Sequence, residues 1–210
     1  MKIKTFVVVV LSVLTIATLE IKAQNVQQLG PNYFGAGIRS SNFNYIASKG
    51  RQQGQNWCWA ACVAMVLQYN GIIVSQQEVV MRCYGNLVDR PGGDPQMFTA
   101  LSGWGRNVYG GVSTIYSNNY PTNAAEIQIW LASNKPLIVG LNQPNSSIGH
   151  AYVLTAIYYS NQYDYNGNIV GIIPDKVVLR DPWPYNPSRQ EISWSDFASR
   201  VNMCYKVWVN

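Results

Sequence analysis

Residues 52–61 read Gln-Gln-Gly-Gln-Asn-Trp-Cys-Trp-Ala-Ala and are the most informative part of the sequence. Their cysteine, Cys58, begins the segment Cys58 to Tyr69, which has high helix propensity and is apolar nearly all round. This pattern predicts a buried helix. The dipole and the free backbone N–H groups at the start of a helix stabilise a thiolate, which is the nucleophilic form of cysteine. We therefore predict that Cys58 is a nucleophile.

Two structural alternatives for Cys58 are a buried thiol and a disulfide to Cys62, one helical turn later. The disulfide is disfavoured because it needs Cβ atoms about 3.5–4.5 Å apart, closer than positions four apart on a helix allow. A glutamine a few residues upstream can place its side-chain amide beside the backbone N–H of Cys58. Together these two donors would form an oxyanion hole.

The sequence contains a single histidine, His150, so this imidazole is the only one that could act as a base for Cys58. It follows a glycine at the head of a predicted strand. A base needs a third group to hold its ring. Asp181 follows the apolar segment 177–179, and it reaches the far ring nitrogen if that strand lies beside the one beginning at His150. The alternatives are a structural histidine and an aspartate that serves only its proline turn. Weaker candidates for the third group are Asp175, Asp164 and Asn142.

Neither a cofactor nor a nucleic-acid partner is predicted. One histidine and four dispersed cysteines, at positions 58, 62, 83 and 204, lack the close ligand spacing of a zinc site. The glycine-rich segment 91–94 lacks the lysine and the strand of a phosphate loop. The net charge of +5 falls to +3 without residues 1–23, and the basic residues are scattered. This balance gives no case for nucleic-acid binding.

Residues 1–23 have the features of a secretory signal peptide. Lys2 and Lys4 form a short basic region, Phe6 to Leu19 is an almost unbroken apolar run, and Ala23 stands at the expected cleavage point. The run is shorter than the roughly 20 residues that span a bilayer as a helix. An uncleaved membrane anchor is the alternative. We expect a secreted or periplasmic monomer with no membrane attachment after signal removal.

The remaining chain predicts one α+β domain over residues 51–210. Residues 24–50 are polar and rich in Asn, Gly and Ser, which favours an extended arm that wraps the domain. Helices are predicted over 58–69, from the capping box at 75–78 to 83–85, from 94–95 onward, over 123–133, and after a cap at Ser193 and Asp196. Strands are predicted over 136–141, 149–158, 169–173, 176–180 and 205–209, with a hairpin turn at 164–168. Helices followed by an antiparallel sheet indicate the α+β class.

Three segments together resemble bacterial papain-like cysteine peptidases, in particular the AvrRpt-type effector proteases and the double-glycine leader peptidases. They are Gln-x-x-x-Asn-Trp-Cys-Trp-Ala-Ala, Gly-His-Ala before an apolar strand, and Arg-Asp-Pro-Trp-Pro. The resemblance covers residues 50–209 and implies a helical half, a sheet half and an active-site cleft between them. It also implies Cys58 as nucleophile, His150 as base and Asp181 as the group that orients the base. Gln52, six residues before Cys58, would complete the oxyanion hole, with Gln53 as the alternative. The long inhibitory propeptide of many papain relatives is missing, because residues 24–50 are too short to resemble one.

The function these features favour is that of a secreted cysteine endopeptidase, which hydrolyses a polypeptide through an acyl-thioester intermediate. One alternative is a cell-wall peptide hydrolase or transpeptidase with the same cysteine and histidine. Another is a secreted binding module that keeps the fold without the activity. The segments 85–94 and 116–123 are predicted to be loops that contribute to specificity.

A disulfide between Cys62 and Cys83 is also expected. The two predicted helices that carry them are joined by a short turn and should pack antiparallel, which would bring position 62 opposite position 82 or 83. Secretion would permit the oxidised state. The alternatives are two buried thiols and a bridge between Cys83 and Cys204.

Overall fold

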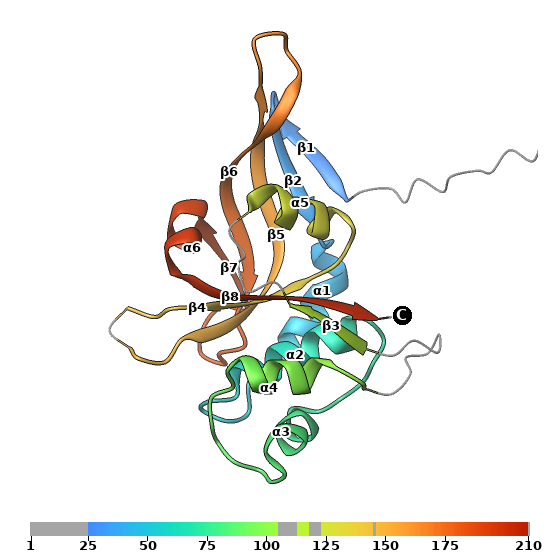
Figure 1. Cartoon of the computed structure of the whole chain (residues 1–210), viewed down its shortest axis with the longest axis vertical. Helices are drawn as coiled ribbons and strands as arrows, with labels where there is room; N and C mark the ends of the chain where they lie inside the picture. The colour runs from blue at the N-terminus through green and yellow to red at the C-terminus, as the bar shows by residue number, and fades with distance from the viewer. Residues whose placement is uncertain (1–24, 105–112, 118–122, 145, 210) are drawn as a thin grey trace, which may run out of the picture.

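The computed structural model describes residues 25–104, 113–117, 123–144 and 146–209 (Figure 1). The helices in these ranges are α1 (Ser40–Lys49), α2 (Cys58–Tyr69), α3 (Gln76–Tyr84), α4 (Asp94–Leu101), α5 (Ala124–Ala132) and α6 (Trp194–Arg200). The strands are β1 (Val26–Gly30), β2 (Tyr33–Gly37), β3 (Ser113–Ser117), β4 (Leu137–Leu141), β5 (His150–Tyr163), β6 (Ile169–Arg180), β7 (Arg189–Ser193) and β8 (Val201–Val209). The predicted α+β class is confirmed. Across the described ranges, no helix combines the length and the apolar character needed to cross a membrane.

Local signals in the sequence set most helix boundaries. The Ser75 side chain accepts a hydrogen bond from the Glu78 N–H, and the Glu78 carboxylate accepts one from the Ser75 N–H, so the predicted capping box begins α3. Gly85, with φ of 73°, ends α3 in the left-handed conformation that glycine adopts without strain. Asn123 caps α5 as expected. α4 differs slightly, because its N-cap is Gly93 and Asp94 is already helical.

The strands form one antiparallel sheet around β5. β6 pairs with one edge of β5 along most of its length, and β4 and then β2 occupy the other edge. β5 and β6 extend together as a long hairpin, drawn in orange at the top of Figure 1. Its turn is the predicted one: Gly167 has φ of 81°, and the Asp164 carboxylate accepts hydrogen bonds from two backbone N–H groups in the turn.

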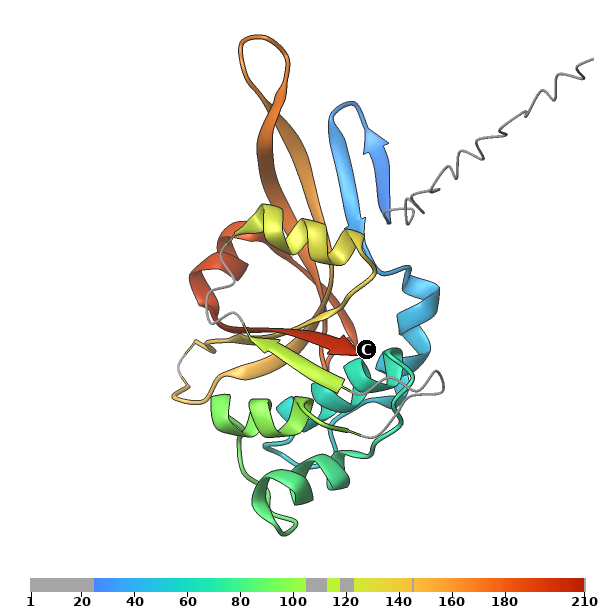
Figure 2. The same cartoon turned by 45° about the vertical axis from the view of Figure 1, so that its right-hand side comes forward.

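Helices cover both faces of the central sheet. α1 to α4 share one hydrophobic core with the face that carries Ile138 and Val153, whereas α5 and α6 share a second core with the face that carries Val139 and Leu154. In Figure 2, α2 to α4 lie on one side of β8, and α5 and α6 lie on the other. β4 is therefore buried on both faces, which explains why its sequence Leu-Ile-Val-Gly-Leu is apolar throughout instead of alternating.

The extended arm predicted over residues 24–50 is wrong for the described part of that segment. Residues 26–37 form the β1–β2 hairpin, which extends the sheet by pairing with β5, and residues 40–49 form α1. α1 buries only Phe43, Ile46 and Ala47, so its helical pattern is weak among polar neighbours. The short strands β3 and β7 were also not predicted. The predicted loop 116–123 begins inside β3, and residues 118–122 lie outside the described residues.

The expected disulfide between Cys62 and Cys83 is absent, and all four cysteines are free. α2 and α3 do pack together, but the two thiols face different neighbours. Cys62 is fully buried in the core and lies close enough to Cys58 and Asp181 for their charges to affect it. The Cys83 thiol points toward α4 and donates to the carbonyl oxygen of Gln96 at 3.4 Å.

Four free thiols give the first prediction. Unfolded, unreduced protein should react with four equivalents of an alkylating reagent, whereas a Cys62–Cys83 bridge would leave only two. Peptide mapping by mass spectrometry counts the modified positions. Native protein should react first at the half-buried Cys58 and Cys83 and slowly at the buried Cys62 and Cys204. Recovery of a peptide joined through Cys62 and Cys83 would contradict the structure.

Candidate active site

Cys58 is the first residue of α2, and the tryptophans on either side of it fix its surroundings. The Trp57 indole donates to the carbonyl oxygen of Val88 at 2.8 Å, and the Trp59 indole donates to that of Arg90 at 3.1 Å. A Cβ atom on Gly92 would lie 2.4 Å from the Trp59 ring, so only glycine fits there. The predicted specificity loop 85–94 is thus tied to the start of the helix that carries the thiol.

His150 and Asp181 meet because β5 and β6 are antiparallel neighbours. β5 begins at His150 and β6 ends at Arg180, so both residues lie at the same end of the strand pair. The Nε2–H of His150 donates to Oδ1 of Asp181 at 2.8 Å. Cys58 lies close enough to His150 to raise the pKa of its imidazole. Since Asp181 engages Nε2, Nδ1 is the ring nitrogen left to act on Cys58. The structure therefore brings together three of the predicted site residues, in the order Cys58, His150, Asp181.

The Asp181 carboxylate is completely buried and accepts four hydrogen bonds. Besides His150, its donors are the backbone N–H of Trp183 at 2.8 Å, the Asn186 amide at 2.8 Å and the Gln190 amide at 2.6 Å. Burial alone would raise the pKa of Asp181. The hydrogen bonds from His150, Asn186 and Trp183, with the charge of His150, outweigh burial and hold that pKa below its usual value. Asp181 is therefore a carboxylate at neutral pH.

These carboxylate and thiol neighbours favour the protonated form of His150. Burial lowers the pKa of the imidazole, but the hydrogen bonds to Asp181 and Cys58 and the negative charge of both groups raise it from 6.5 to about 9. At neutral pH the ring is thus an imidazolium between two acidic groups. The edge of the ring packs against Tyr152, with centroids 4.6 Å apart, which restricts its rotation.

The other three cysteines are in environments that keep them protonated. Burial raises the pKa of Cys62 well above its usual value and that of Cys204 to about 12. Burial also raises the pKa of Cys83, although Arg82 partly opposes it. A thiol in such surroundings is a poor nucleophile. Cys58 differs from all three in its contact with an imidazole.

Gln52 and Gln53 point in different directions. Gln52 is buried, and its Nε2 donates to the carbonyl oxygens of Gly54 and Gln55, both at 2.9 Å. Both amide hydrogens of Gln52 are therefore engaged with the loop that leads into α2, and its Oε1 is buried without a partner. Gln53 is exposed and accepts a hydrogen bond from Gln77 of α3. The oxyanion role of Gln52 stays a prediction.

Sequence reasoning missed the residues that hold Asp181 and join the two halves of the site. Asn186 lies in the proline-rich turn after Asp181, and an asparagine in such a turn is a sequence signal for a side chain that bonds back to a nearby residue. Gln190 on β7 carries no sequence signal. The backbone N–H of Gln52 donates to the carbonyl oxygen of Pro182 at 2.8 Å, and the Arg51 guanidinium bonds to carbonyl oxygens of the same turn. These contacts attach the segment before Cys58 to the turn after Asp181.

An open cleft of about 380 Å³ lies beside His150. One wall comes from Asn56, two residues before Cys58, and the others come from Gln143, Ser146, the start of β5 with the two residues before it, and the turn after Asp181. Trp183 and Tyr152 give the cleft aromatic surface, and Asn56, Gln143 and Asn186 give it amide groups. Such a mixture suits an extended polypeptide, which presents amide groups and side chains together. The cleft therefore borders His150, and one of its walls comes from the segment that leads into α2.

Comparison with known proteins shows which family combines this fold and these motifs. The sequence model of the Peptidase_C39 like family matches residues 41–209. The chain belongs to this family. This Peptidase_C39 like protein is therefore a cysteine peptidase, and the expected papain-like fold is confirmed.

A solved structure supports the fold of this Peptidase_C39 like protein. The peptidase domain of Streptococcus ComA, a bifunctional ABC transporter involved in a quorum-sensing pathway, aligns over 76% of this chain and 94% of its own length. The TM-score is 0.50 and the sequence identity is 14%. No curated protein sequence matches the chain.

The pKa of His150 gives the second prediction, and the chain offers a clean measurement because it has one histidine. The C2–H resonance of that ring should titrate with a pKa of about 9. Asp181→Asn removes a carboxylate that stabilises the imidazolium and should lower the pKa, and Cys58→Ala should lower it for the same reason. The matched control is Asp164→Asn, in the exposed hairpin turn, which should leave the pKa unchanged. An unshifted pKa in Asp181→Asn would contradict the electrostatic pairing.

Proposed function

We propose that this cysteine peptidase is a secreted endopeptidase that cleaves peptide bonds through an acyl-thioester intermediate, with Cys58, His150 and Asp181 as its triad. The observation that carries the proposal is the position of His150, the only imidazole in the chain, which is hydrogen-bonded to Asp181 and lies close enough to Cys58 to interact with it. Secretion rests on the signal-peptide pattern of residues 1–23.

In the proposed reaction Cys58 is the nucleophile and the protonated His150 is the acid. The Cys58 thiolate attacks the carbonyl carbon of the scissile peptide bond, and His150 gives its proton to the departing amine. The acyl group is then bound to the Cys58 sulfur as a thioester. Neutral His150 takes a proton from water, which attacks the thioester carbonyl and releases the acid. The proton returned to His150 restores the starting pair, while Asp181 keeps the ring oriented and stabilises its charge.

Negative charge on the carbonyl oxygen needs donors in both steps. The backbone N–H of Cys58 is one of the first N–H groups of α2, which have no partner within the helix, and the helix dipole favours an anion there. Gln52 is the proposed second donor. In this conformation its amide bonds to Gly54 and Gln55, so one of those bonds must be exchanged for the oxyanion during the reaction.

The triad assignment gives the third prediction. Cys58→Ala and His150→Ala should each reduce the turnover of a casein substrate by about a millionfold, and Asp181→Ala should cost about two orders of magnitude less. The matched control is Cys83→Ala, the other half-buried cysteine, which should remain active. Circular dichroism of each variant checks that the fold is kept. Full activity in Cys58→Ala or His150→Ala would contradict the triad assignment.

Activity on purified cell-wall peptides but not on casein would favour the cell-wall hydrolase over the endopeptidase.

The adjacent glutamines give the fourth prediction. Gln52→Ala should lower kcat by about 100- to 1000-fold with little change in KM, because an oxyanion donor acts mainly in the transition state. Gln53→Ala is the matched control, since its side chain faces α3, and it should have little effect. Thermal unfolding of Gln52→Ala measures any loosening of the loop. The reverse result would move the role to Gln53, and full activity in both variants would leave the second donor elsewhere.

A further inference from the structure

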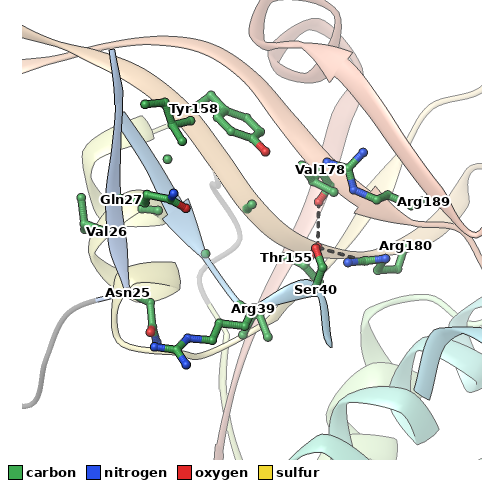
Figure 3. Close-up of a pocket in the computed structure, with 16 residues that line it drawn as sticks. Asn25, Val26, Gln27, Arg39, Ser40, Thr155, Tyr158, Val178, Arg180 and Arg189 are labelled. Carbon is green, nitrogen blue, oxygen red and sulfur yellow. Dashed lines mark hydrogen bonds between the residues drawn. The ribbon is translucent and has the colours of Figure 1, made fainter. Parts of the chain in front are cut away.

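A second pocket, of about 440 Å³, lies between β1, β2 and the start of α1 on one side and β5 and β6 on the other (Figure 3). It shares no lining residue with the cleft beside His150. Three arginines line it: Arg39, Arg180 and Arg189. Figure 3 shows Arg180 and Arg189 together on one side of the pocket and Arg39 across from them, beside Asn25. No acidic side chain is among the residues that line it.

Arg180 is the most unusual of the three because it is only 2% exposed. Its guanidinium donates to the Thr155 hydroxyl at 3.2 Å and to the Asn44 amide oxygen at 2.9 Å, and both of these partners are neutral. Among the described residues, no carboxylate lies within ion-pair distance of Arg180. These contacts use two of the five N–H donors of the guanidinium. A buried charge without a counter-ion is costly, so an anion that reached it would be bound strongly.

The partner of Arg180 across the sheet is another arginine. In the β6–β7 register Arg180 lies directly opposite Arg189, and like charges in that position destabilise a sheet. Arg189 bonds to Glu191, which also forms an ion pair with Lys176 at 2.7 Å. Even if Glu191 is counted against the three arginines, the pocket keeps an excess of two positive charges. A dianion between Arg180 and Arg189 would turn their repulsion into a shared attraction.

The start of α1 borders the same pocket. Arg39 and Ser40, at the first turn of this ten-residue helix, line it. The first turn of α1 has no acidic residue and no capping side chain. Its N-terminal partial positive charge therefore adds to that of the arginines.

We propose that this pocket binds a dianionic tetrahedral oxyanion, a phosphate or sulfate group, between Arg180, Arg189 and the start of α1. Two neighbouring guanidinium groups offer paired N–H donors in the geometry that such a group accepts, and the surplus of two charges matches a dianion better than a monocarboxylate. The pocket is larger than the oxyanion alone, and Tyr158, Gln27 and Asn25 line the remainder. The oxyanion is therefore expected to be part of a small organic molecule, such as a phosphate monoester.

Calorimetry and thermal unfolding of the purified protein test this proposal without measuring peptidase activity. The probes are inorganic phosphate, sulfate and glycerol phosphate, with acetate as the monoanion, at matched ionic strength and at a pH where phosphate is a dianion. Phosphate and sulfate should raise the Tm by a few degrees, because a ligand that binds only the folded state stabilises it, and acetate should raise it much less. Tighter binding of glycerol phosphate than of phosphate would show that the ligand is an organic phosphate. Equal binding would show that the site takes the free ion.

Substitutions assign the binding to the pocket. Arg189→Gln, on the partly exposed β7, should weaken phosphate binding about tenfold, and Arg39→Gln should weaken it as well. The matched control is Arg82→Gln on α3, which removes the same charge from a helix outside the pocket and should leave binding unchanged. If Arg189→Gln does not fold, Arg39→Gln decides. Unchanged binding in the folded pocket variants, or a Tm shift with acetate equal to that with phosphate, would overturn the proposal.

Discussion

The active site depends on the hydrogen bonds that the buried carboxylate of Asp181 accepts. This carboxylate receives hydrogen bonds from the start of β5, from the turn that follows β6 and from β7, so it fixes three segments of the sheet against one another. A completely buried carboxylate is tolerated only when its oxygens have donors, and here they have four. Because the segment before Cys58 bonds to the same turn, the position of the thiol also follows from this carboxylate.

Two polar sites use consecutive residues at the end of β6. Arg180 ends β6 and Asp181 follows it, and successive side chains along an extended chain point to opposite sides. Asp181 meets an imidazolium and neutral donors, so its charge is balanced within the protein. Arg180 contacts neutral oxygens and lies opposite a second arginine, so its charge is not balanced by an acidic side chain. The same strand end thus contributes Asp181 to the triad and Arg180 to the proposed oxyanion site.

The helical half contributes rigidity where the chemistry requires it. α2 is buried along most of its length and packs between α1, α3 and α4 and the sheet. Its first residue is therefore held in place while the thiol itself remains half-buried. The indole N–H groups of Trp57 and Trp59 bind the loop before α4 to the start of α2. The two tryptophans that flank the cysteine in the sequence motif therefore also shape the surroundings of Cys58.

Local sequence determined the elements whose signals lie within a few residues. Three elements could be predicted in this way: the bounds of α2, the capping box of α3 and the Asn-Gly hairpin. Cys58 and His150 could also be predicted as partners. Helix propensity, capping and the chemistry of one cysteine and one histidine need no long-range information. Only the tertiary structure decided the β1–β2 hairpin, α1 and β7, whose weak patterns are stabilised by pairing and packing with distant segments. It also decided that Cys62 and Cys83 face apart, that Asn186 and Gln190 hold Asp181, and that Arg180 and Arg189 lie together. Helix rotation and strand register set each of these contacts, and both are fixed by the whole core rather than by neighbouring residues in the chain.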